Sequence, residues 1–166
     1  DSVLIFTRTR HRAHRLAQQI AREGYKVTSL HSDRTQGQRQ SALNGFKDGR
    51  YQIMVATDIA ARGLDIESIS HVMNYDMTDT ADAYIHRIGR TGRAERTGDA
   101  FTLVTDEDDD MIRTLEKIMN QRLPRQTLAD FDYSAAAPAV DPSRVPVPRG
   151  PKPLHHEPHW RPNHHP

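Results

Sequence analysis

The stretch 53-IMVATDIAARGLD-65 combines an apolar run with an abrupt change to polar residues, and this change decides the predicted fold. Residues 53–56 are apolar throughout, which is typical of a strand covered on both faces in a parallel sheet. A hydroxyl, two carboxylates, an arginine and a glycine follow directly. Because ligands of such sheets bind beyond the carboxyl ends of the strands, these polar residues are candidates for a binding site.

The same alternation of strand and helix patterns extends over residues 1–133 and predicts an α/β fold, a parallel sheet with helices on both faces. Short apolar runs bounded by polar residues mark the strands. Strands are expected at Val3–Phe6, Lys26–Leu30, Ile53–Ala56, His71–Asn74 and Ala100–Val104.

Four helices are expected from apolar residues that recur with helical spacing. Gly24 and Gly49 should end the first two. Thr35 and Gln38 form a predicted capping box, and the third helix should begin at Thr80. The buried positions are expected to be Ala13, Leu16, Ala17 and Ile20; Ala42, Leu43 and Phe46; Tyr84, Ile85 and Ile88; and Met111, Leu115, Ile118 and Met119.

The acidic run 105-TDEDDD-110 precedes the last of these helices. It could be a cation site, but carboxylates at a helix N-terminus also complement the helix dipole, and we favour that interpretation.

Composition excludes several classes of protein. The 23 Lys and Arg against 22 Asp and Glu give a net charge of +1, so a polyanion site would have to be a local cluster. Cysteine is absent, which excludes a disulfide framework and fits a cytoplasmic protein. There is no apolar run long enough to cross a membrane. The chain begins without methionine, directly before an apparent buried strand, so we expect it to be a piece of a longer protein.

Residues 134–166 differ in composition and are predicted to be a disordered, flexible Pro/His-rich tail, separate from a domain at 1–133. Nine of the ten prolines lie there, and they block both helix and sheet. The segment 155-HHEPH-159 suggests zinc, but histidines among prolines lack fixed geometry, and we expect no metal site. The tail's cations leave two interpretations open, a flexible spacer or an auxiliary tether for a polyanion.

Three further polar stretches fall beyond predicted strands or their helices. The run 7-TRTRH-11 could be a phosphate site at a helix N-terminus or ordinary capping by Thr9. Gln36 and Arg39 lie one helical turn apart and could grip a backbone together. The run 86-HRIGRTGR-93 brings three arginines together around glycines, which suits a concentrated anionic charge. A single-stranded polynucleotide and a nucleoside triphosphate would match these groups.

Four of these stretches also carry a family resemblance. The segments VLIFTRTR (3–10), QGQR (36–39), ATDIAARGLDI (56–66) and HRIGRTGR (86–93) are similar, in the same order, to motif IV, the Q-x-x-R motif, motif V and motif VI of DEAD-box RNA helicases. Over about residues 3–133 the chain resembles the C-terminal RecA-like domain of a bacterial-type DEAD-box ATP-dependent RNA helicase, a branch of superfamily 2. In that family two RecA-like domains close around ATP and RNA.

The resemblance implies roles for individual residues. Arg90 and Arg93 would reach the γ-phosphate of ATP, with Arg93 as the arginine finger, and Phe6 would pack behind this motif. The residues implied in ATP binding are Arg62, Gly63, Asp65 and Arg87. Among them, Asp65 would bind the ribose, and Arg62 would bridge the ATP site and the RNA site. Arg87 would couple this motif to neighbouring ones. The residues implied in holding the RNA backbone are Thr9, Arg10, Gln36, Arg39 and Thr57.

The chain contains no G-x-x-x-x-G-K-[ST] phosphate loop and no Asp-Glu-Ala-Asp motif. In the family these belong to the N-terminal RecA-like domain, which also holds Mg²⁺, so this chain is expected to be inactive as an ATPase without that partner domain. An alternative is a non-catalytic RNA-binding or partner-docking module. A DNA helicase or DEAH-type translocase is disfavoured by His86-Arg87 at the start of motif VI.

Overall fold

The computed structural model describes residues 2–61, 69–91 and 98–135, and it divides the chain into two compact units, residues 1–124 and 125–166. In the second unit, the backbone N–H of Leu128 donates to the hydroxyl of Tyr133 at 2.9 Å, and the rings of Phe131 and Tyr133 meet edge to face. The predicted tail lies almost wholly outside the described residues, so its boundary at residue 134 stays a prediction.

The first unit contains a five-stranded sheet in which every neighbouring pair is parallel, as predicted. The strands lie in the order β2-β3-β1-β4-β5, so β1 is at the centre. Their bounds are β1 Val3–Phe6, β2 Val27–Leu30, β3 Ile53–Ala56, β4 His71–Asn74 and β5 Asp99–Thr102. The predicted second strand therefore starts one residue later, and the fifth is shifted toward the N-terminus.

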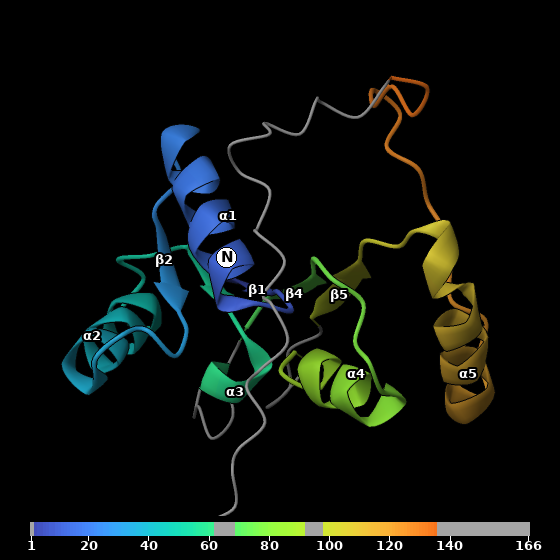
Figure 1. Cartoon of the computed structure of the whole chain (residues 1–166), viewed down its shortest axis with the longest axis horizontal. Helices are drawn as coiled ribbons and strands as arrows, with labels where there is room; N and C mark the ends of the chain where they lie inside the picture. Colours follow the sequence, from blue (N-terminus) through green and yellow to red (C-terminus); the bar gives the residue numbers. More distant parts are fainter. Residues whose placement is uncertain (1, 62–68, 92–97, 136–166) are drawn as a thin grey trace, which may run out of the picture. The chain divides into compact units, whose positions relative to one another are not determined.

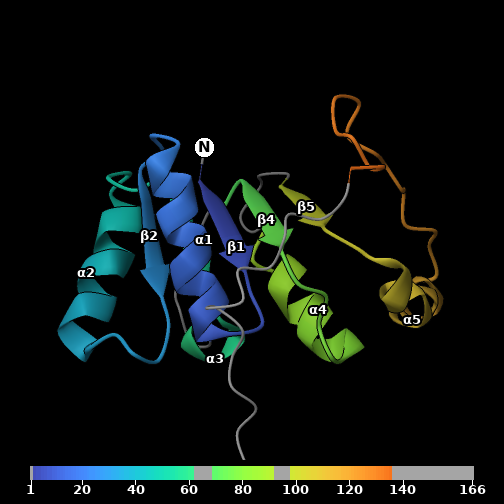
Figure 2. The same cartoon turned by 45° about the horizontal axis from the view of Figure 1, so that its top comes forward.

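Helices connect the strands and lie on both sides of the sheet, which confirms the predicted layers (Figures 1 and 2). The elements are α1 Arg10–Arg22, α2 Gln36–Lys47, α3 Asp58–Ala61, α4 Ala81–Ile88 and, after a 3₁₀ turn at Asp106–Asp108, α5 Asp109–Met119. One apolar cluster joins α1 to Ile5 and Val55, and the cluster on the other face joins α2 and α3 to Leu4, Phe6 and Leu30.

The helix ends follow the local sequence. Thr35 and Gln38 form the predicted capping box at the start of α2, and Thr80 caps α4 through the backbone N–H of Ala83. Gly24 and Gly49 follow α1 and α2 with φ of 86° and 73°, in the left-handed region that favours glycine. Helix α4 ends at Ile88, directly before Gly89.

Two predicted core positions are wrong. Ile85 in α4 is 40% exposed and Ile118 in α5 is 55% exposed. The buried side of α4 instead carries Tyr84 and Arg87, and that of α5 carries Ile112 and Leu115. Strand β5 is also largely exposed rather than covered on both faces, because it lies at the edge of the sheet. A polar residue can replace an apolar one on the inner face of a helix when it finds partners there, as Arg87 does.

Candidate functional site

The carboxyl ends of the strands meet at one edge of the sheet, which we call the carboxyl rim. In Figure 2 the arrowheads of β1, β2 and β4 point to the side where α3 lies. Among the described residues, those implied by the sequence lie in the loops that leave these strands or in and just after the helices that follow them, so the rim is the candidate site. Parallel register explains this convergence, because Phe6 of β1 lies beside Ala56 of β3 and Asn74 of β4.

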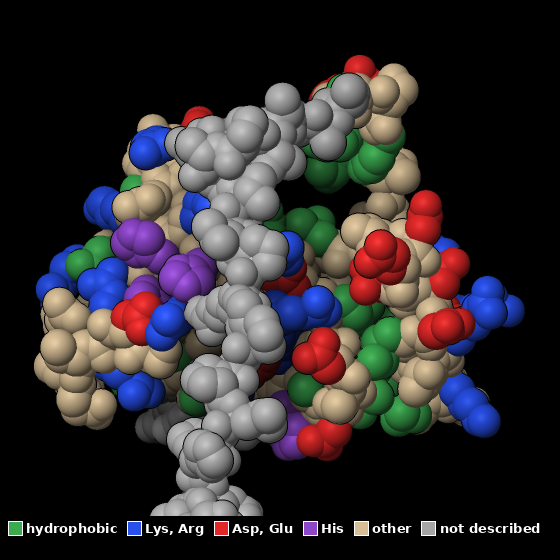
Figure 3. Space-filling view, viewed as in Figure 1, with side chains coloured by type: hydrophobic (Ala, Val, Ile, Leu, Met, Phe, Trp, Pro, Cys, Tyr) green, Lys and Arg blue, Asp and Glu red, His purple; other side chains and the backbone are tan. Residues whose placement is uncertain are grey.

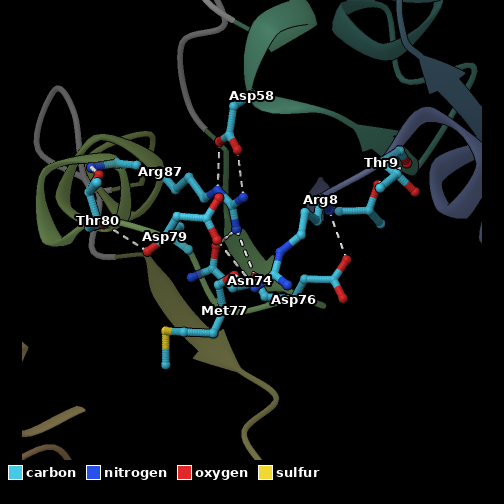
Figure 4. Close-up of polar contacts among 12 residues, drawn as sticks. Arg8, Thr9, Asp58, Asn74, Asp76, Met77, Asp79, Thr80 and Arg87 are labelled. Carbon is cyan, nitrogen blue, oxygen red and sulfur yellow. Dashed lines mark hydrogen bonds and ion pairs between the residues drawn. The ribbon is translucent and has the colours of Figure 1, made fainter. Parts of the chain in front are cut away.

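The side chain of Arg87 is only 3% exposed. Figure 4 shows its contacts with Asp58 and Asn74. Its Nε and Nη2 donate to the two carboxylate oxygens of Asp58, both at 2.6 Å. Its Nη1 donates to the Asn74 side chain at 3.2 Å and to the backbone carbonyl of Asp76 at 2.9 Å. The guanidinium also lies 5.1 Å from the centre of the Phe6 ring, the contact expected for that residue. A paired, stacked arginine of this kind fixes the elements that hold it.

The segment after β4 is a second centre of polar contacts, which the sequence reasoning missed. The carboxylate of Asp76 accepts from the backbone N–H of Arg8 at 2.8 Å and from the guanidinium of Arg12. Arg8 also donates to the carbonyl of Met77 at 3.1 Å and pairs with Asp79 at 3.4 Å. The rule applied to the other strands, that polar residues just past a parallel strand are candidates, would have identified Asp76.

Thr9 and Arg10 lie at the start of α1. The hydroxyl of Thr9 caps the helix by accepting from the backbone N–H of Arg12 at 3.2 Å. Arg10 donates to Asp33 in the loop after β2 at 2.8 Å, and about half of each side chain is exposed. The structure therefore shows the capping by Thr9 that was one of the two interpretations of this stretch. The side chain of Arg10 stays at the surface.

Thr57, Gln36 and Arg39 belong to neighbouring loops and helices. The backbone N–H of Thr57 donates to the carbonyl of Leu30 at 3.3 Å, which joins the ends of β2 and β3. Gln36 is exposed as the first residue of α2. One turn later, Arg39 donates to the carbonyl of Ala60 in α3 at 3.4 Å. The structure thus brings α2 against α3, close to the strand end that carries Thr57.

Arg90 lies just past the end of α4, where its backbone N–H donates to the carbonyl of Arg87 at 3.1 Å. It borders a hollow of about 330 Å³ between α3 and α4. The lining residues are Phe6, Asp58, Ala61, Thr80, Asp82, Ala83, His86, Arg87 and Arg90. A larger hollow of about 420 Å³ beside Tyr25 and Ile53, at the start of β3, contains none of the implied site residues, so we do not assign the site there.

His31 is buried at the end of β2, and neither of its ring nitrogens has a hydrogen-bond partner among the described residues. The ring of His14 meets it edge to face at 6.1 Å between centres. Burial lowers the pKa of His31 below its ordinary value, and the nearby Arg34 guanidinium lowers it further, while Asp33 opposes this shift. The neutral ring is therefore favoured in the folded protein.

Four implied residues, Arg62, Gly63, Asp65 and Arg93, lie outside the described residues, and their roles stay predictions. Within the described part of the chain, there is no group of three or more candidate ligands that could hold a metal ion. No helix there is long and apolar enough to cross a membrane.

Charge is unevenly distributed on the face shown in Figure 3. Blue and purple side chains gather on the side of α1, and red ones gather around the start of α5. The first six residues of α1 include Arg10, His11, Arg12, His14 and Arg15, with no carboxylate among them. The side of the rim nearest α1 is therefore suited to an anionic ligand, although the chain as a whole is nearly neutral.

Comparison with known proteins agrees with this geometry. The helicase conserved C-terminal domain family matches residues 1–95. The DEAD-box ATP-dependent RNA helicase CshA of Bacillus subtilis is 43% identical over 132 residues, which cover 80% of this chain and 27% of that protein. The ATP-dependent rRNA helicase RRP3 of Candida glabrata is 44% identical over 127 residues, 76% of this chain and 26% of that protein.

Solved structures show the same fold. The E. coli DEAD-box protein SrmB, in a crystal structure with regulator of ribonuclease activity A, matches with a TM-score of 0.75 and 35% identity, covering 84% of this chain and 82% of that one. The C-terminal domain of the DEAD-box protein Dbp5 matches with a TM-score of 0.66 and 34% identity, covering 74% of each chain. The chain spans about a quarter of the length of the curated relatives it matches. It belongs to the helicase conserved C-terminal domain family and is the C-terminal RecA-like domain of a DEAD-box helicase.

Proposed function

We propose that this chain is the second RecA-like domain of a cytoplasmic ATP-dependent RNA helicase. In the whole protein it would supply arginines to the ATP phosphates and part of a track for the RNA backbone. The reaction would be hydrolysis of ATP to ADP and phosphate, with closure and reopening of the cleft between two domains. The relatives named above are ATP-dependent RNA helicases by name, which supports this activity for the whole protein.

The observation that carries the proposal is the bidentate pair between Arg87 and Asp58. It joins the segment 86–93 to the segment 56–66, the two stretches implied in ATP binding. Because Arg87 is fully engaged within the domain, it orients the end of α4 and is not itself the group that reaches a phosphate. Arg90 and Arg93 follow it in the chain and are the arginines that we assign to the γ-phosphate, with Arg93 as the finger. Asp65, Arg62 and Gly63 complete the proposed nucleotide contacts.

For RNA, we assign the backbone contacts to the α1 side of the rim. Thr9, Arg10, Gln36, Arg39 and Thr57 offer hydroxyl, amide and guanidinium groups, which suit phosphate and sugar rather than base edges. Binding to single-stranded or duplex RNA should therefore show little sequence preference and should weaken as salt is raised.

The remaining parts of the ATP site are assigned to an N-terminal RecA-like domain of the same protein. That domain would supply the phosphate loop and hold Mg²⁺, which would neutralise the charge that develops on the phosphates. This chain alone should then have negligible ATPase activity. Measurable RNA-stimulated ATPase of the isolated chain at a rate near that of the whole protein would contradict this assignment.

The finger assignment is tested in the whole protein by steady-state ATPase assays with saturating RNA. Arg93→Ala and Arg90→Ala should each lower kcat, with a loss of about 10³-fold or more for the finger itself. Arg113→Ala, an exposed arginine of α5, is the matched control and should leave kcat unchanged. If Arg93→Ala retains the wild-type kcat, the finger is a different residue.

A further inference from the structure

The outer face of α1 carries positive charge that the function proposed above does not use. Between Ser2 and Arg22 the sequence holds five arginines and two histidines but no aspartate or glutamate. The chain as a whole has a net charge of only +1, so the rest of it has an excess of acidic residues. Figure 3 shows blue and purple side chains gathered on the side of α1. The positive charge is therefore concentrated there, where it would attract a polyanion.

Arg15 and Arg22 lie on this face beyond the carboxyl rim. They are two helical turns apart and therefore point the same way, and both are exposed. Arg10, nearer the rim, pairs with Asp33. In contrast, neither the Arg15 nor the Arg22 side chain makes an ion pair or a hydrogen bond with any residue that the structure describes. A guanidinium without such partners keeps its charge and its donors for a ligand.

Helix α1 leads away from the rim. In Figure 2 it runs back from the end of β1 toward the opposite edge of the sheet. With a rise of about 1.5 Å per residue, Arg22 lies about 18 Å along the helix from Arg10, which is proposed to hold RNA at the rim. A stacked strand rises about 3.4 Å per nucleotide, so this distance corresponds to about five nucleotides. A strand that follows the helix from the rim therefore passes Arg15 and then Arg22.

The hollow of about 420 Å³ lies where this path ends. It contains none of the residues implied by the family resemblance, but its lining includes Arg22, two isoleucines and Tyr25, which is 58% exposed. An exposed tyrosine ring offers a flat face on which any nucleobase can stack. Gln19 and Glu23 also line the hollow, and their polar groups suit the edge of a base. An arginine for a phosphate thus stands beside an aromatic ring for a base.

We propose that the outer face of α1 is a second RNA-binding site, in which Arg15 and Arg22 bind phosphates and Tyr25 stacks on a base. Its ligand is the part of a single strand that extends beyond the rim, so the inference rests on the function proposed above. Unpaired arginines next to an exposed aromatic ring are the combination that binds single strands without sequence preference. An acidic protein would need the arginines alone, so Tyr25 distinguishes the two ligands. We call these three residues the α1 site.

The test uses the whole protein and two fluorescent oligouridylates, whose dissociation constants are measured by anisotropy without nucleotide. The short one has about 8 nucleotides and is sized for the rim, whereas the long one has about 16 and also reaches the α1 site. The double variant Arg15→Gln/Arg22→Gln removes both proposed phosphate contacts. The matched control, Arg113→Gln/Arg122→Gln, removes two exposed arginines in and just after α5.

The wild type should bind the long oligouridylate more tightly than the short one. Arg15→Gln/Arg22→Gln should bind the long one about tenfold or more weakly, with its affinity for the short one within about twofold of the wild type. Each phosphate contact on a single strand adds about 0.7 to the slope of log affinity against log salt, so that slope should fall by about 1.4 for the long one. The control should match the wild type. Equal weakening of both lengths, an unchanged slope or an equal loss in the control would each overturn the proposal.

The stacking contact is tested by comparing Tyr25→Leu with Tyr25→Phe. Leucine has no aromatic face, so the affinity for the long oligouridylate should fall by about fivefold or more. Phenylalanine keeps the ring and should bind like the wild type. A loss in both variants would overturn the stacking role. A loss in neither would overturn it too, and with weaker binding by the arginine variant it would indicate a surface that recognises charge alone, as an acidic protein would.

Failure of the α1 site and failure of the proposed function give different results. A wild-type protein whose ATPase the short oligouridylate does not stimulate would refute the helicase assignment. A wild-type protein that shows this stimulation but binds both lengths equally would overturn the α1 site alone.

Discussion

Helices α1 and α5 begin with opposite charges, although the N-terminus of every helix carries a partial positive charge. The acidic run 106–110 leads into α5, and the Asp108 carboxylate accepts from the backbone N–H of Thr105 at 2.8 Å. Helix α1 begins with Arg10, His11 and Arg12, which the helix dipole disfavours. The charges at the start of α5 therefore stabilise that helix locally, whereas the charges at the start of α1 oppose its dipole and leave the Thr9 cap as local support.

The cationic start of α1 is supported by other elements instead. Arg10 pairs with Asp33 from the loop after β2, and Arg12 pairs with Asp76 from the segment after β4. Sites where the sequence goes against the preference of the local structure, and tertiary contacts offset the cost, are often functional. From this contrast we expect α5 to serve mainly packing and the start of α1 to belong to the proposed RNA surface.

The largest effect on stability is expected from Arg87→Ala, which would break the tertiary support of the rim. The change leaves the carboxylate of Asp58 and the side-chain oxygen of Asn74 without the guanidinium that donates to them in a site that is mostly buried. We expect the free energy of unfolding to fall by about 3–5 kcal/mol, the range for breaking a buried ion pair. Urea unfolding followed by circular dichroism measures it. Arg113→Ala on α5 should change it by less than about 0.5 kcal/mol, and a similar small change for Arg87→Ala would contradict the rim's structural role.

Leu115→Ala should have the next largest effect, because it tests whether α5 stabilises the domain through packing. Leu115 is fully buried in a cluster with Met77, Tyr84 and Ile112. Loss of its side chain should cost about 2–4 kcal/mol of unfolding free energy. Ile118→Ala on the exposed side of α5 is the control and should cost much less. Equal losses for the two variants would show that the inner face of α5 is assigned wrongly.

Acidification should lower the stability of the folded protein through His31, which lies on the α1 side of the rim. Its pKa in the folded protein is lowered mainly by burial, so below the ordinary value of 6.5 the unfolded chain binds the proton more readily. Stability should therefore be unaffected by this group above that pH and should fall as the pH drops through it. The groups around the ring are Arg34, Asp33, His14 and Arg10.

Thermal unfolding at about pH 7.5 and about pH 5.5 measures this dependence. The variant His31→Leu should lose less stability on acidification than the wild type, and His11→Leu, at an exposed position of α1, should behave like the wild type. Identical pH profiles for wild type and His31→Leu would rule out His31 as the source.

Most of the sheet and the helix ends could be predicted because they depend on neighbours in the sequence. The apolar run of Ile53–Ala56 and the capping box of Thr35 need no knowledge of the rest of the chain. The inner face of α4 could not be predicted in this way. Helical spacing favours Ile85 as buried, but Arg87 occupies the inner face because Asp58 and Asn74, distant in sequence, supply its partners. Burial of a charge depends on such long-range pairs.

The smallest effect is expected from His11→Glu, which directly tests the contrast between the two helix starts. A carboxylate in the first turn of α1 should complement the dipole and raise the unfolding free energy by about 0.3–1 kcal/mol. The same charge should repel a phosphate backbone, so the affinity of the whole protein for the short oligouridylate should fall, and this loss should shrink as salt is raised. Gln18→Glu adds the same charge farther along the helix and should change neither quantity as much. If His11→Glu raises the stability but leaves the RNA affinity unchanged, the start of α1 is not part of the RNA surface. RNA binding would then not explain why this helix begins with positive charges that its dipole disfavours.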